Sequence, residues 1–310
     1  MENLLSKERR LYLMGIAIML VVLHHLAIFG AWRFFYIFEP GRIGVDIFFF
    51  LSSYGCCYSM ERYSVWNFYK RRLRRLFPLY AIFLFCVLSF FYHEKSVGER
   101  IVTFLSHISG LAVFNSEHLI AWYIPSTILL YLFFPIIYKF LILIKDYFWI
   151  QMGLLVFLIL LNNKFPIIMY LGLALRLPII FMGMLTYLYI RENKPRLLLF
   201  YVSVLIIIYF VPRHFVMVSS VAIPLLLYGL GESDFKFPFS SIISFLGKHS
   251  LDIYLGQNIA IETMMRRGFF DSMTNKLSIR VIAVLLLGAM LACVFYGVQK
   301  YFWKLFVRNT

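Results

Sequence analysis

The sequence predicts an all-α fold, a polytopic membrane bundle of about ten transmembrane helices. Three observations lead to this prediction. Of the 310 residues, 62% are apolar and only 15% are charged, whereas a typical globular chain is about 45–50% apolar. The mean hydropathy is +0.82. The apolar residues also gather in runs of the length that crosses the hydrocarbon core, about 20 residues each. A soluble protein is therefore excluded.

Polar residues, Pro and Gly separate the predicted spans. The spans fall near residues 11–30, 43–60, 77–92, 120–140, 147–163, 173–190, 197–212, 216–231, 242–262 and 280–303. A shorter apolar stretch at 101–114 is expected to be interfacial or re-entrant. No internal repeat or soluble region stands out, so residues 1–310 are expected to form one integral-membrane domain.

The placement of charge predicts the topology. The chain has 30 Lys and Arg against 15 Asp and Glu, a balance that in a soluble protein would suggest nucleic acid as a partner. Here the basic residues lie between hydrophobic spans, and more of them fall on the side that holds both termini. The positive-inside rule then predicts cytoplasmic N- and C-termini in the cell membrane, with lipid and not nucleic acid as the partner. The four cysteines lie in apolar stretches, which favours buried thiols over disulfides or a metal site.

Two adjacent histidines, His24 and His25, end the segment GIAIMLVVLHH in the upper half of the first span. An ionisable group inside the membrane is costly and marks a functional site by default. Asp46 lies at a similar depth in the next, antiparallel span. We therefore expect its carboxylate to orient the His25 imidazole and to stabilise its protonated form, as a general base requires. The structural alternatives stay open: histidines bonded within the bundle, and an aspartate at a helix start.

Two further sets of residues are candidates for binding. Arg176 lies just below the outer edge of its span and needs an anionic or carbonyl partner. Trp122 and Tyr123 begin another span on the same side, as substrate contacts or as interfacial anchors. On the opposite side, a basic loop before Pro78 holds Arg71, Arg72, Arg74 and Arg75. It indicates either a topogenic cluster or a phosphate site, because guanidinium groups bind phosphate oxygens in a bidentate way.

These segments resemble the acyltransferase-3 family, integral-membrane enzymes that move acyl groups from cytoplasmic acyl-CoA to extracytoplasmic sugars and other acceptors. The similar segments, in chain order, are GIAIMLVVLHH, RIGVDIFFFLSSYG with FYKRRLRRLFPLY, WYIPSTILLYLFFP, RLPIIFMGM and FLGKHSLDIYLGQ. The family's first helix has an arginine, ten intervening residues and the reactive histidine. That spacing points to His25 and falls on Met14. Arg10 is one turn earlier and its long side chain can extend toward the same face. Ser53 and Gln257 stand where the family has Gly and His.

The resemblance implies an O-acetyltransferase that uses acetyl-CoA and modifies a cell-envelope polysaccharide or its lipid-linked precursor. His25, or its neighbour His24, would be the general base or the transient acyl acceptor, with Asp46 orienting it. The arginine cluster and Arg10 would bind the CoA phosphates, and Arg176, Trp122 and Tyr123 would contact the acceptor. The alternatives are a non-catalytic polysaccharide exporter or flippase, and a family member that has lost catalysis. Homo-oligomerisation is left open.

Overall fold

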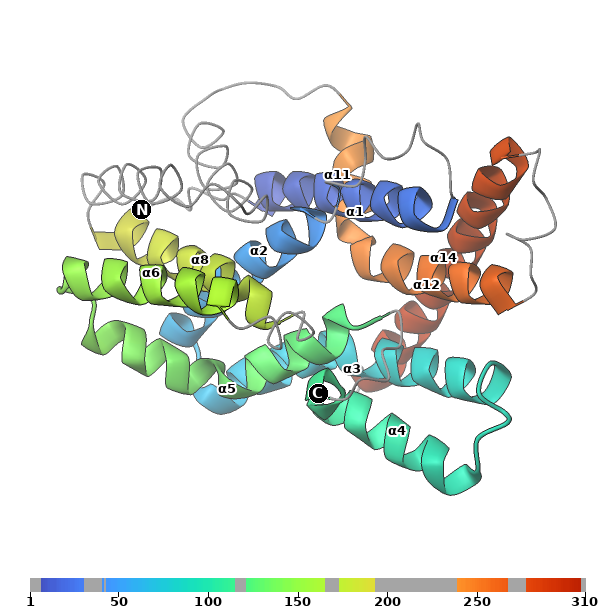
Figure 1. The fold of residues 1–310 in the computed structure, drawn as a ribbon, viewed down its shortest axis with the longest axis horizontal. Helices are drawn as coiled ribbons and strands as arrows, with labels where there is room; N and C mark the ends of the chain where they lie inside the picture. Colours follow the sequence, from blue (N-terminus) through green and yellow to red (C-terminus); the bar gives the residue numbers. More distant parts are fainter. Residues whose placement is uncertain are drawn as a thin grey trace.

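The computed structural model describes residues 7–30, 41, 43–114, 121–164, 173–192, 239–266 and 277–307, and the regular structure within them is helical (Figure 1). The helices are α1 (Lys7–Gly30), α2 (Ile43–Arg62), α3 (Val65–Phe90), α4 (Val97–Ser109), α5 (Tyr123–Leu143), α6 (Phe148–Lys164), α8 (Leu177–Glu192), α11 (Ser240–Lys248), α12 (Ser250–Arg266) and α14 (Leu277–Val307), with short 3-10 turns η2 (Leu111–Phe114) and η3 (Ala174–Arg176). The predicted all-α class is confirmed for these ranges.

Six stretches of the described helices are long and apolar enough to cross a membrane: Lys7–Ala27, Ile43–Arg62, Val65–Phe90, Tyr123–Leu143, Ala174–Glu192 and Ile282–Tyr301. Each matches one of the predicted spans. A shorter apolar stretch in α6, Phe148–Leu161, corresponds to the span predicted at 147–163. The spans predicted at 197–212 and 216–231 lie outside the described residues. The chain is thus a membrane protein with several spans, and the number ten stays a prediction.

The basic loop predicted before Pro78 is a helix, so that prediction was wrong. Ser64 caps α3, its side chain accepting a hydrogen bond from the Asn67 backbone N–H at 3.4 Å. The arginine-rich segment lies in the second and third turns of this helix. Arg, Lys and Leu are good helix formers, and Pro78 lies inside the helix without ending it. In a helix the arginines of this segment point in different directions, so only some of them can line the same cavity.

The single span predicted at 242–262 was also wrong, because the chain forms two helices there. α11 ends at Lys248 and α12 begins at Ser250, with His249 between them. α11 packs closely on α1: a β-carbon at Gly247 would collide with the Leu11 carbonyl oxygen. α12 continues beside α1, where Gln257 donates to the Val22 carbonyl at 3.3 Å.

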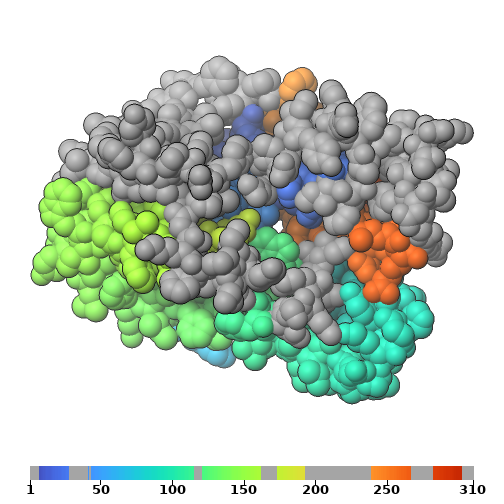
Figure 2. Space-filling view, viewed as in Figure 1, coloured from blue at the N-terminus to red at the C-terminus, as the bar shows by residue number. Residues whose placement is uncertain are grey.

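α4 is an amphipathic helix of 13 residues, about 20 Å long and therefore shorter than a span. It begins with a capping box between Ser96 and Glu99, and it ends at Gly110, whose φ of 84° is the left-handed conformation that glycine adopts readily. In the space-filling view α4 forms the lower right corner of the molecule (Figure 2). The interfacial or re-entrant placement of residues 101–114 remains a prediction.

Candidate active site

The centre of the bundle contains a cavity of about 110 Å³ between α1, α2, α3, α5 and α12. Three cations line it: Arg10 from the first turn of α1, and Arg72 and Arg75 from α3. Arg10 and Arg75 are exposed, whereas Arg72 is half-buried. The positive charges of Arg72 and Arg75 act unfavourably on the charge of Arg10. An anion bound among them would relieve this repulsion.

Hydroxyl groups line the cavity beyond the arginines. They belong to Ser52, Tyr123, Thr127, Tyr131, Ser250 and Tyr254. The Ser52 and Tyr131 hydroxyls are 2.9 Å apart. The Arg72 guanidinium lies 5.5 Å from the Tyr131 ring centroid and donates a short hydrogen bond to the Gly55 carbonyl. Arg72 is thereby held in one orientation, with its charge directed into the cavity.

Only part of the predicted arginine cluster reaches this cavity. On a helix, residues three and four apart share a face, so Arg72 and Arg75 point the same way as the buried Leu76. Arg71 and Arg74 are exposed, and the Arg71 guanidinium lies 4.2 Å from the Tyr63 ring centroid. Neither is among the described residues that line the cavity. Arg10 and Met14, in contrast, line it together, as the one-turn spacing between them predicted.

His25 and His24 point in different directions from α1. At about 100° per residue, His25 falls about 40° from the cavity-lining Val21, and His24 falls about 60° from it on the other side. His24 faces the chain just before α2, where a β-carbon at Gly41 would lie 3.0 Å from the His24 Cβ. His25 faces α12, where the Gln257 side chain is a neighbour of its imidazole. The helical geometry therefore puts His25 nearer to the cavity face.

Asp46 forms an ion pair with Arg176. The Arg176 Nε donates a hydrogen bond to Asp46 Oδ1 at 3.2 Å. Both residues are buried: Asp46 is 0% exposed and Arg176 is 7% exposed. The Arg176 guanidinium also lies 5.1 Å from the Trp122 ring centroid. Phe49 packs edge-on against Tyr123, with centroids 5.1 Å apart. Four of the predicted residues are thus neighbours where α2, η3 and the start of α5 meet: Asp46, Arg176, Trp122 and Tyr123.

The expected contact between Asp46 and His25 is not formed, although both lie in the described part of the chain. The packing of α1 on α2 explains the difference. A β-carbon at Gly44 would collide with the Ala17 carbonyl, and one at Gly41 with the Leu20 carbonyl, so the helices are antiparallel with residue 44 level with residue 17. Asp46 then lies level with about residues 15–19 of α1, roughly 9–15 Å along the axis from His25. Equal depth, assumed from the sequence, was wrong. The catalytic roles of His25 and Asp46 stay predictions.

Several residues that line the cavity were not among those predicted from the sequence. Ser52, Thr127 and Tyr131 are single polar residues within apolar spans, and Tyr254 lies in a segment predicted as one continuous span. The spacing of Ser52 and Gly55, and of Thr127 and Tyr131, puts each pair on one helix face, which was the available signal. The sequence alone does not show that these two helix faces meet.

Comparison with known families gives a match over most of the chain. The acyltransferase-3 family model, described as an acyltransferase domain, matches residues 12–298. The matched range includes every residue of the cavity except Arg10. The searches of curated proteins and of solved structures found no match.

Proposed function

This chain belongs to the acyltransferase-3 family, and from that premise we propose that it transfers an acetyl group from cytoplasmic acetyl-CoA to a hydroxyl of an extracytoplasmic glycan. The acceptor is a cell-envelope polysaccharide or its lipid-linked precursor, and the enzyme acts in the cell membrane with both termini in the cytoplasm. Membership supports acyl transfer as the activity. The identities of the acyl donor, of the acceptor and of the membrane in which the enzyme acts are parts of the proposal.

The central cavity, with cations at one end, is the observation that carries the proposal. Arg10, Arg72 and Arg75 bring three guanidinium groups to one cavity from two helices that are about 60 residues apart in the sequence. Guanidinium groups bind phosphate oxygens through paired N–H donors. CoA carries several phosphate groups, so its phosphorylated end matches the arginines and its thioester arm matches the narrow cavity beyond them.

The length of α1 fits a long, slender donor. Arg10 and His25 are 15 residues apart in α1, which corresponds to about 22 Å along the helix. If the phosphates of CoA are held at the arginines, the arm that carries the thioester has to span this distance to reach His25. A pantetheine arm provides such a reach, whereas a compact acyl donor does not.

His25 would act on the acceptor hydroxyl. Its imidazole accepts the hydroxyl proton, and the oxygen attacks the thioester carbonyl carbon. The carbon–sulfur bond then breaks, CoA leaves as the thiolate, and the proton passes from His25 to the sulfur. Gln257, beside His25, can hold the imidazole in one orientation. Trp122, half-buried and backed by the buried Arg176, presents an aromatic ring that suits a sugar.

Label transfer by the purified protein tests the proposal. With radiolabelled acetyl-CoA and a de-acetylated envelope polysaccharide, the wild type is expected to transfer label. His25→Ala should lower the rate by about 100-fold or more, the usual contribution of a general base. The neighbouring variant His24→Ala is the matched control and should keep most of the activity.

The outcomes separate the possibilities. Equal rates for His25→Ala and the wild type would remove His25 from the mechanism. A wild-type protein that binds acetyl-CoA and transfers no label to any glycan would contradict the enzyme proposal and favour the export of a glycan intermediate.

A further inference from the structure

A second and larger cavity, of about 550 Å³, lies between α1, α11, α12 and α14. Its walls are mostly apolar, including Ile18, Leu246, Val284 and Ala289. Its size is within the range of cavities that bind small organic ligands. Apart from Gln257, its lining residues have no part in the proposed acyl transfer. We refer to it as the α14 groove.

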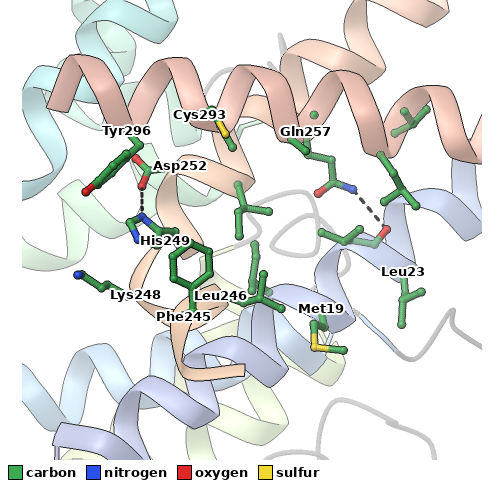
Figure 3. A pocket seen from close by; sticks show the side chains of 18 residues that line it. Met19, Leu23, Phe245, Leu246, Lys248, His249, Asp252, Gln257, Cys293 and Tyr296 are labelled. Carbon is green, nitrogen blue, oxygen red and sulfur yellow. Dashed lines mark hydrogen bonds and ion pairs between the residues drawn. The ribbon is translucent and has the colours of Figure 1, made fainter. Parts of the chain in front are cut away.

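The charged groups of the α14 groove gather at one end of it, and Gln257 lies farther along (Figure 3). At one end His249 Nδ1 and Asp252 Oδ2 are 3.1 Å apart, with Tyr296 packed edge-on against His249 at 4.7 Å between centroids. Lys248 projects beside them and has no ion-pair partner among the described residues. Farther along the groove is Gln257, which donates a hydrogen bond to the Val22 carbonyl. A ligand that fits has one anionic end and a long apolar body.

The groove opens toward the side of the bundle that faces lipid. Phe245, Leu285 and Tyr296 line it and are also exposed. α14 carries further exposed apolar residues, and only 22% of its membrane window is buried. A hydrocarbon chain in the bilayer therefore reaches the groove directly, without passing through water.

The charged end lies level with the N-terminal part of α1. Gly247, next to Lys248, packs on the Leu11 carbonyl in the N-terminal part of α1, and α12 runs from there along α1 to Gln257 near His25. Residues 249 to 257 span about 12 Å of helix. Lysine near the end of a membrane helix extends its ammonium group to the interface.

We propose that the α14 groove binds one anionic phospholipid. Its headgroup phosphate contacts Lys248, and one acyl chain lies along α12 and α14 toward Gln257. The charge complementarity at Lys248 and the apolar walls that open to the bilayer select this occupant. The inference is independent of the acetyl donor and acceptor, and holds whether or not the protein transfers an acyl group.

Lipid binding to the purified full-length protein tests the proposal. The delipidated protein is titrated with palmitoyl-oleoyl phosphatidylglycerol or phosphatidylcholine, and bound lipid is counted by native mass spectrometry. We expect the wild type to retain one phosphatidylglycerol with at least a fivefold preference over phosphatidylcholine. Lys248→Gln should reduce that preference about fivefold, the effect of one basic side chain near an anionic headgroup. Lys139→Gln removes an exposed lysine outside the groove and should change nothing.

A second variant tests the apolar wall. Ala289 is exposed and lines the groove, so Ala289→Phe fills the groove without disturbing the buried core. It should lower the retention of both lipids at least fivefold. As a measurement on the unaltered protein, phosphatidylglycerol with a photoreactive acyl chain should cross-link to α12 or α14 within the groove. Equal lipid preference in Lys248→Gln and the wild type, or cross-links confined to other helices, would overturn the proposal. Equal retention of phosphatidylcholine by the wild type would also overturn it, since it would show an apolar site without charge selection.

Discussion

At the scale of single residues, Asp46 and Arg176 form the most deeply buried ion pair among the described residues. Two charges are removed from water there, and each compensates the other. The pair joins α2 to η3, which are 130 residues apart. Its direct consequence is for stability, because the loss of one partner leaves the other charge buried.

We expect Asp46→Ala to lower the free energy of unfolding by about 3–5 kcal/mol, the usual cost of breaking a buried pair. Asp46→Asn keeps an acceptor for Arg176 and should cost less. The melting temperature of the purified protein in detergent measures both. The double variant Asp46→Asn/Arg176→Gln should be more stable than the sum of the single effects predicts. Additive effects would show that the two side chains do not depend on each other.

His107, on α4, gives a pH-dependent contribution to stability. It is 3% exposed, its Nδ1 lies 3.0 Å from the Tyr80 hydroxyl, and burial lowers its pKa from 6.5 to about 4. The folded state therefore binds this proton less readily than the unfolded state. The stabilisation is present above pH 6.5 and is lost as the pH falls from 6.5 toward 4.

We expect the free energy of unfolding to fall by up to about 3 kcal/mol across that window. His107→Gln does not titrate and can still bond to Tyr80, so it should flatten the pH dependence between pH 6.5 and 4. Melting temperatures of both proteins at half-unit pH steps provide the measurement. The control is the exposed His93→Gln, which should keep the wild-type profile. Identical slopes for His107→Gln and the wild type would contradict the assignment.

At the scale of elements, the sequence predicted where apolar helices occur better than where they break. The runs that became α1, α2, α5 and α14 were predicted within a few residues, because length and hydropathy suffice for a span. The break at His249 was missed, since α11 and α12 are apolar on both sides of it. The start of α3 after Ser64 was missed, because the charged residues of the segment that follows suggested a loop. A Ser cap a few residues before a run of Lys, Arg and Leu, which are good helix formers, was the available signal.

Close packing of α11 on α1 depends on glycine at position 247. A β-carbon there would collide with the Leu11 carbonyl oxygen, and the Gly15 backbone nitrogen would be 2.7 Å away. Gly247→Ala should therefore separate the two helices and lower the melting temperature. At Gly98, in α4, a β-carbon would meet no atom within 4 Å, so Gly98→Ala should be neutral or stabilising by up to about 1 kcal/mol. Thermal unfolding of both variants is the measurement, and equal effects would refute the close contact.

At the scale of the whole molecule, the candidate site is built from parts that are distant in the sequence. α1 brings Arg10, α3 brings Arg72 and Arg75, and α12 brings Tyr254 to the same cavity. The candidate residues were largely predictable, because charged side chains in or beside apolar spans are conspicuous. Which of these residues contact each other was not predictable. The sequence suggested a contact between His25 and Asp46, whereas in the structure Asp46 pairs with Arg176. Tertiary register between helices decides such pairs, and it leaves little trace in one sequence.

A ligand that bridges these helices should stabilise the entire bundle. Binding to the folded state alone adds about 2.7 kcal/mol at a concentration 100 times the dissociation constant. CoA should therefore raise the melting temperature of the wild type, by an amount that increases with concentration. Arg72→Gln/Arg75→Gln removes two cations that line the cavity, and should weaken CoA binding at least tenfold and abolish most of the shift.

The matched control is Arg71→Gln/Arg74→Gln, which removes the same charge from the same helix at exposed positions outside the cavity. Its CoA-dependent shift should equal that of the wild type. Because both double variants change the net charge by two, a difference between them reports the direction of the side chains and not the overall field. Equal loss in both would mean that CoA meets only a diffuse positive surface, and an unchanged shift in both would return the cluster to a role in topology.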